Sequence, residues 1–140
     1  MRNRTQSWVA AACLVATPFV STAVAAGGID GTKTIVCAVV DVVGCTEEGQ
    51  CIEGTARGFE LPEFMIMDAD KKAIRAAYEA GHNETSPVKN MQQSGDHLVL
   101  QGVENGRGWD MAINTRTGRM SASGVGDAVS FLAFGTCTTP

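Results

Sequence analysis

Basic residues are few in this chain and nowhere gather into a run. The 15 acidic residues outnumber the 11 lysines and arginines, which gives a formal net charge of −4 at pH 7. Clustered lysines and arginines are what bind the phosphate backbone of a nucleic acid or an anionic membrane surface. We therefore expect no nucleic-acid partner.

Long apolar runs are missing after the first 25 residues. No later stretch approaches the roughly 20 apolar residues that a membrane helix needs. Before that point, Arg2 and Arg4 precede an apolar run from Trp8 to Val24, followed by Ala25. This pattern is typical of a secretory signal peptide. We predict a leader over residues 1–25 with cleavage near Ala25, no membrane span after its removal, and a periplasmic or secreted protein.

Familiar catalytic motifs are missing as well. The chain has neither a Gly-x-Ser-x-Gly elbow nor a His-Glu-x-x-His pair. Its two histidines, His82 and His97, have no metal-ligating partner at a useful spacing, which is typical of solvated surface residues. The sequence therefore predicts no catalytic residue, no metal and no cofactor.

Cysteine, in contrast, is present in a pattern that suits an exported domain. Cys13 lies in the predicted leader, and the other four are Cys37, Cys45, Cys51 and Cys137. Four cysteines allow two disulfides in three connectivities. Cys45 and Cys51 flank a short polar turn that favours a local bridge, so Cys37 and Cys137 would join the two ends of the fold. A zinc site is the alternative, but the Cys-x7-Cys-x5-Cys spacing lacks the closely paired cysteines that zinc prefers.

The apolar pattern predicts mainly β structure. Residues 34–43 are rich in Val and Ile and indicate a buried strand, and residues 64–67 form a short apolar run. Residues 68–80 suit either a helix or a hairpin, and we favour the hairpin. The glycine-rich residues 26–33 predict a flexible entry segment, and residues 81–87 a polar loop.

Two hairpins between His97 and Ser123 can be registered from their turns. Asn105-Gly106 favours a two-residue turn, which places Gly102 opposite Trp109. Residues 115–118 supply the second turn. Both registers, derived separately, place one apolar set on the same face: Leu98, Leu100, Trp109, Met111, Ile113, Met120 and Ala122. A slip of one residue would bury the polar set instead, so the register is strongly specified.

These elements combine into an antiparallel meander. Residues 124–127 form a third turn that leads into a strand over residues 129–135. A first strand that carries Cys37 and a last strand that runs into Cys137 suit a sheet whose ends meet. We predict one disulfide-stabilised β-rich domain over residues 26–140, built as a small up-and-down barrel or a curled sheet, with at most one short helix.

Several segments carry a resemblance to known proteins. They are Leu100–Glu104, Gly108–Ile113, Thr117–Met120, Phe134–Thr138 and Leu61–Phe64, together with the cluster of Cys37, Cys45 and Cys51. In these segments the chain resembles an uncharacterised family of small exported proteobacterial proteins of unknown function. The resemblance implies a periplasmic location and assigns no chemistry.

The build is also similar to that of bacterial periplasmic lysozyme inhibitors, which are small disulfide-closed β-barrels. Those proteins use a Ser-Gly-x-x-Tyr segment to block the lysozyme cleft. Ser123-Gly124 begins such a segment here, but Asp127 stands at the position of the tyrosine. This resemblance therefore concerns the build, and a lysozyme-inhibitor-like role is an alternative reading.

We predict a non-enzymatic binding module for a small apolar ligand or an envelope protein partner. Trp109 and Phe134 mark its candidate binding site, although both aromatic side chains could equally pack in a core. The alternative is a small envelope hydrolase that uses acidic residues. A hydrolase of that kind would bring two or three carboxylates together in a pocket, at least one of them with a raised pKa.

Overall fold

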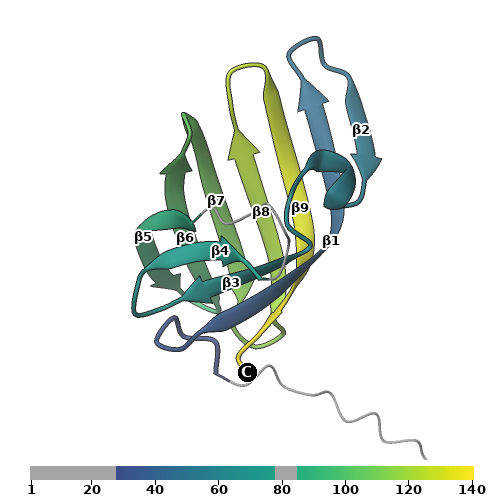
Figure 1. Cartoon of the computed structure of the whole chain (residues 1–140). Coiled ribbons are helices and arrows are strands. Elements are labelled where there is room, and N and C mark those ends of the chain that lie inside the picture. The colour runs from purple at the N-terminus through teal and green to yellow at the C-terminus, as the bar shows by residue number, and fades with distance from the viewer. Residues whose placement is uncertain (1–27, 78–84) are drawn as a thin grey trace, which may run out of the picture.

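The computed structural model describes residues 28–77 and 85–140, so the predicted leader and His82 lie outside the described residues. Within the described residues, nine antiparallel strands and one short 3-10 helix follow each other (Figure 1). The elements are β1 (Ile35–Thr46), β2 (Cys51–Gly54), η1 (Arg57–Phe59), β3 (Phe64–Asp68), β4 (Ala73–Ala76), β5 (Thr85–Ser94), β6 (His97–Glu104), β7 (Arg107–Asn114), β8 (Arg119–Val125) and β9 (Val129–Thr138). The predicted mainly β fold is confirmed.

Eight of these strands close into a barrel. The hydrogen-bonded order runs from β1 through β3 and the following strands to β9, and β9 pairs back with β1 from Val36 to Thr46. β2 stays outside this ring and pairs only with the second half of β1, from Val42 to Cys45. The structure is thus the up-and-down barrel of the prediction and not the open curled sheet.

A bulge lets β1 serve three partner strands. Its first half pairs with β3 and its second half with β2, while β9 runs along the whole strand. The register with β9 shifts between Val39 and Asp41. An extra residue at this point bends the strand, and it also changes which side chains face inward. Cys37 is buried before the shift, and Val42 is buried after it.

The registers of the two predicted hairpins are confirmed. Gly102 pairs with Trp109 across β6 and β7, and Ile113 pairs with Met120 across β7 and β8. The predicted hairpin after residue 67 is also present, with Asp68 paired with Ala73. The predicted polar loop was wrong for residues 85–87, which belong to β5, and residues 81–84 lie outside the described part.

Two disulfides join cysteines on neighbouring strands. Cys37 on β1 bonds to Cys137 on β9, with their Cα atoms 4.0 Å apart, and Cys45 bonds to Cys51 across β1 and β2. The pairing favoured from the sequence is therefore confirmed, and the zinc alternative is wrong. Disulfides persist in oxidising compartments, so this pair indicates an extracytoplasmic protein.

One end of the barrel is packed by the segment before β1. Ile29 is only 2% exposed and belongs to the main apolar core. A side chain at Gly31 would come within 3.0 Å of the Met91 sulfur, so the backbone lies close to the core here. The prediction of a flexible entry segment was wrong for residues 28–33, because one apolar side chain anchors them under the barrel.

Candidate functional site

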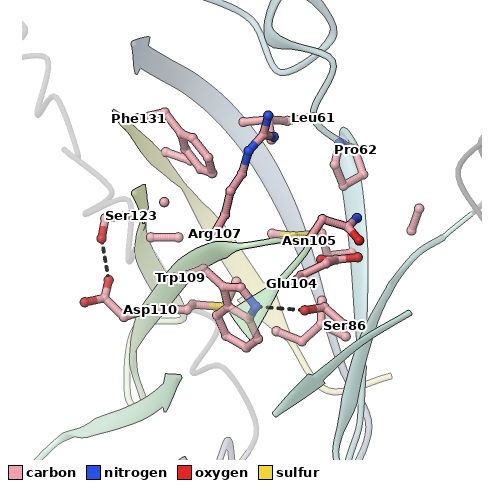
Figure 2. A pocket seen from close by; sticks show the side chains of 18 of the residues that line it. Leu61, Pro62, Ser86, Glu104, Asn105, Arg107, Trp109, Asp110, Ser123 and Phe131 are labelled. Carbon is pink, nitrogen blue, oxygen red and sulfur yellow. Dashed lines mark hydrogen bonds between the residues drawn. The ribbon is translucent and has the colours of Figure 1, made fainter. Parts of the chain in front are cut away.

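The opposite end of the barrel contains a pocket of about 250 Å³. Its wall comes from β3 to β9 and from the segment that follows η1 (Figure 2). Most of the wall surface is apolar and comes from side chains such as Leu61, Ile74, Trp109 and Phe131. An eight-stranded barrel is just wide enough to be filled by side chains or to hold one small ligand. The end near the β6–β7 turn has room for such a ligand.

Glycines alternate with aromatic residues in the layer of the barrel that forms this pocket. Paired residues on neighbouring strands run, from β6 to β1, in the order Gly102, Trp109, Gly124, Phe131 and Gly44. A glycine contributes no side chain to the interior. Three of the five positions in this layer therefore carry no side chain of their own, and the space over each glycine is open to a neighbouring ring.

The aromatic rings lie over these glycines. A methyl group on Gly102 would overlap with the ring of Trp109, and one on Gly124 would overlap with the ring of Phe131. The ring of Phe59, the last residue of η1, covers Gly44 in the same manner. Each ring thus lies against the backbone of a glycine, and the rings of Trp109 and Phe131 line the pocket.

A buried hydroxyl group fixes the orientation of Trp109. The indole Nε1–H donates a hydrogen bond to Ser86 Oγ on β5 at 2.7 Å (Figure 2). Ser86 is 8% exposed and is the buried polar residue of the described part of the chain. Its oxygen accepts the bond from Trp109, and no described residue accepts the Ser86 hydroxyl proton. Among the described residues, the pocket wall therefore holds a hydrogen-bond donor without an acceptor.

Charged side chains surround the mouth. Glu104 and Arg107 pair in register at the end of the β6–β7 hairpin, and both line the pocket. Within the described residues, however, Arg107 makes no ion pair. Figure 2 shows its side chain extending toward Leu61, whereas Glu104 points to the side of Asn105. The two opposite charges thus diverge across the mouth.

The carboxyl groups with a displaced pKa lie elsewhere. Hydrogen bonds from Thr32 lower the pKa of Asp30, one from Thr46 lowers the pKa of Glu48, and the backbone N–H of Lys71 lowers that of Asp68. None of these three acids lines the pocket. Over residues 28–77 and 85–140, no three His, Cys, Asp or Glu side chains gather into a group that could hold a metal ion.

The structure places the two predicted binding residues apart. Trp109 lines the pocket, whereas Phe134 lies on the outer face of β9 and is 43% exposed. Phe131 is the aromatic residue of β9 that reaches the pocket. The signal for it was available, because counting back from Cys137 in steps of two along the strand leads to Phe131 and not to Phe134.

Arg107 and Ser86 were not singled out from the sequence. The predicted register already placed Arg107 on the same face as Trp109, so its position at the pocket could have been derived. Ser86 gave no such signal, since it stands in a polar stretch beside Pro87. The pairing of β5 with β6, which sets Val88 opposite Gly102, brings it beside the indole.

The described helical structure is a single short turn, and no described helix is long and apolar enough to cross a membrane. Comparisons with protein families, with curated proteins and with solved structures give no match to this chain. The pocket itself therefore carries the functional argument.

Proposed function

We propose that this chain is an exported, non-enzymatic binding module whose barrel mouth takes up a small, largely apolar ligand. The observation that carries the proposal is the pocket of about 250 Å³, walled by Trp109, Phe131 and other apolar side chains. Ligand sites are typically concave and apolar, with a few placed polar groups. Ser86 and Arg107 are polar groups of this kind.

A small ligand suits the pocket better than a protein partner does. The wall is made by strands around the barrel and reaches down to Met111, which is 4% exposed. A protein surface could place only a side chain or two into a space of this size. A molecule with a short apolar chain or a single ring could be enclosed along most of its length.

The proposed location is the periplasm or the extracellular space. The apolar run over the first 25 residues and the two disulfides support export. Membership of the family of small exported proteobacterial proteins remains a proposal that rests on the segments quoted above.

Trp109 offers a direct test, because Trp8 and Trp109 are the two tryptophans of the chain. In the Trp8→Phe protein, 1-octanol should shift the Trp109 emission to shorter wavelength with a saturable dose response. Ala122 lies in the pocket wall, so Ala122→Leu should fill part of the space and abolish the shift. Ser121→Leu, one residue away on the exposed side of β8, is the matched control and should keep it. An emission that octanol leaves unchanged in the Trp8→Phe protein would refute the proposed site.

A further inference from the structure

Resting on the proposed function, we propose that the ligand is a small organic acid with an apolar body. Its carboxylate would bind to Arg107 at the mouth, and its apolar body would lie in the pocket beside Trp109 and Phe131. Three observations support the proposal. They are the position of Arg107 at the mouth, the lack of an ion pair between Arg107 and any described acidic residue, and the Ser86 hydroxyl, which has no described acceptor.

Arg107 is positioned to face a ligand. It lies two residues before Trp109 on β7, so both side chains leave the strand on the inner face. Its side-chain stem passes the β8–β9 turn, where a methyl group on Gly126 would lie 3.4 Å from Arg107 Cγ. The guanidinium group extends over the mouth toward Leu61 (Figure 2). A cation is thus held above an apolar pocket.

The acidic residues of the mouth leave this cation unpaired. Glu104 is the cross-strand partner of Arg107, and opposite charges at such positions normally attract each other. The two side chains nevertheless diverge, and no ion pair forms between them in the described residues. Glu60 and Arg75 also line the pocket and contribute one charge of each sign. Asp110 accepts a hydrogen bond from the Ser123 hydroxyl at 2.8 Å.

Two groups of the pocket suit the oxygens of an acid. A guanidinium presents a planar fork of N–H donors that matches a carboxylate in two parallel hydrogen bonds. Deeper in the wall, the Ser86 hydroxyl can donate its proton, because its oxygen already accepts from Trp109 at 2.7 Å. Both groups are donors, so a ligand that supplies acceptor atoms is favoured.

Three probes with the same eight-carbon chain test the head group: octanoate, 1-octanol and octylammonium. Binding is followed by calorimetry and by the indole N–H signal of Trp109 in nuclear magnetic resonance spectra. Octanoate should bind the parent protein about tenfold or more tightly than 1-octanol, as expected for a hydrogen bond to a charged group. Octylammonium should bind most weakly.

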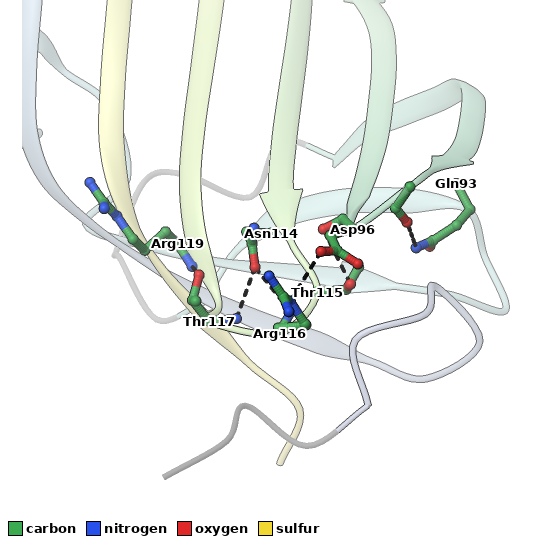
Figure 3. Close-up of polar contacts among 8 residues, drawn as sticks. Gln93, Asp96, Asn114, Thr115, Arg116, Thr117 and Arg119 are labelled. Atoms are coloured by element: carbon green, nitrogen blue, oxygen red, sulfur yellow. Dashed lines mark hydrogen bonds and ion pairs between the residues drawn. The ribbon is translucent and has the colours of Figure 1, made fainter. Parts of the chain in front are cut away.

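Variants assign this preference to one residue. Arg107→Gln should remove the preference for octanoate, so that octanoate and 1-octanol bind to this variant about equally well. Arg107→Lys should keep part of the preference because the charge remains. Arg119→Gln is the matched control, since Arg119 lies at the other end of the barrel (Figure 3) and should not matter. Arg107 is exposed, so its replacement should leave the fold intact, which a thermal unfolding curve would verify.

The outcomes distinguish a failure of the Arg107 assignment from a failure of the proposed pocket. Equal affinity for octanoate and 1-octanol in the parent protein would overturn the assignment to Arg107 but leave the pocket as a binding site. Tightest binding of octylammonium would also overturn it and would point to Glu104. If no probe perturbed the Trp109 signal, both the acid-binding inference and the proposed function would be wrong.

Discussion

Gly102 and Trp109 form the pair on which the pocket wall depends. Their opposition follows from the Asn105-Gly106 turn, where both residues adopt positive φ angles of 48° and 77°. This part of the site could be predicted from the sequence because a local turn sets the register. Ser86 could not be placed in the same way, since its position beside the indole depends on a contact between separate strands.

A methyl group at Gly102 should destabilise the barrel. It would overlap with the Trp109 ring and lie 2.6 Å from the backbone oxygen of Pro87. We expect Gly102→Ala to lower the free energy of unfolding by about 1–3 kcal/mol, as overpacking typically does. Gly108→Ala is the control on the neighbouring strand, because nothing lies within 4 Å of its added carbon. Denaturant unfolding of both variants checks this, and equal losses would contradict the proposed ring packing.

Removal of the Ser86 hydroxyl should also be costly. Ser86→Ala leaves the part-buried indole N–H of Trp109 without the partner that it has at 2.7 Å. The free energy of unfolding should fall by about 1–3 kcal/mol, the usual penalty for an unsatisfied buried donor. The exposed Ser121→Ala should have little effect in the same unfolding experiment. An unchanged indole N–H chemical shift in Ser86→Ala would contradict the role given to this hydrogen bond.

At the scale of elements, the hairpins with explicit turn residues were predicted and the irregular segments were not. The β6–β7 and β7–β8 hairpins combine turn chemistry with alternating apolar residues, and their registers are confirmed. β5 contains Pro87 and a mostly polar sequence, so its strand character depends on the strands beside it. The segment around Ile29 has one buried apolar residue and no periodicity, so its burial could not be predicted from a sequence pattern.

Small polar turns hold these elements together at the end of the barrel opposite the pocket. Asn114 Oδ1 accepts hydrogen bonds from the backbone N–H groups of Arg116 and Thr117, at 3.1 and 3.0 Å (Figure 3). Arg116 also pairs with Asp96 at 3.1 Å, which links the β5–β6 and β7–β8 turns. Such exposed pairs contribute little each, so we expect the apolar core to dominate stability.

The β3–β4 turn should make stability depend on pH. Asp68 Oδ1 accepts from the backbone N–H of Lys71 at 3.1 Å, and this bond is the main reason why the pKa of Asp68 lies below its ordinary value of 3.8. A carboxyl group whose pKa is lower in the folded state stabilises the protein above its unfolded pKa. That contribution is lost as the pH falls through the folded pKa.

We therefore expect Asp68→Asn to lower the free energy of unfolding at neutral pH and to reduce its fall on acidification below about pH 4. Unfolding curves at a series of pH values measure both effects. Asp70→Asn removes the same charge from the same turn without this hydrogen bond and serves as the control. Identical pH profiles for the parent protein and Asp68→Asn would contradict the assignment.

At the scale of the whole molecule, closure of the barrel was predictable and the pocket was not. Cysteines near both ends of the domain and the meander between them indicated that the first and last strands meet, as β1 and β9 do. The pocket depends on how rings from η1, β7 and β9 pack over Gly44, Gly102 and Gly124. The sequence pattern of a single strand cannot predict that packing.

The two disulfides should contribute unequally to stability. The Cys37–Cys137 bond spans 100 residues of sequence and the Cys45–Cys51 bond spans 6. On the loop-entropy model, the long crosslink stabilises the fold by about 4–5 kcal/mol and the short one by about 2 kcal/mol. Paired Cys→Ala variants of each bond, compared by denaturant unfolding, measure the difference. A larger loss from removing the short bond would contradict the closure of the barrel through Cys37 and Cys137.

The most direct test of the pocket is to locate a bound probe. Isotope-filtered nuclear Overhauser spectra of the protein with octanoate report which protons lie next to the alkyl chain. We predict contacts from the chain to Trp109, Phe131 and Met111, inside the mouth of the barrel. Contacts confined to Leu132 and Phe134, which are exposed on β9, would place the ligand on the outer surface and contradict the account.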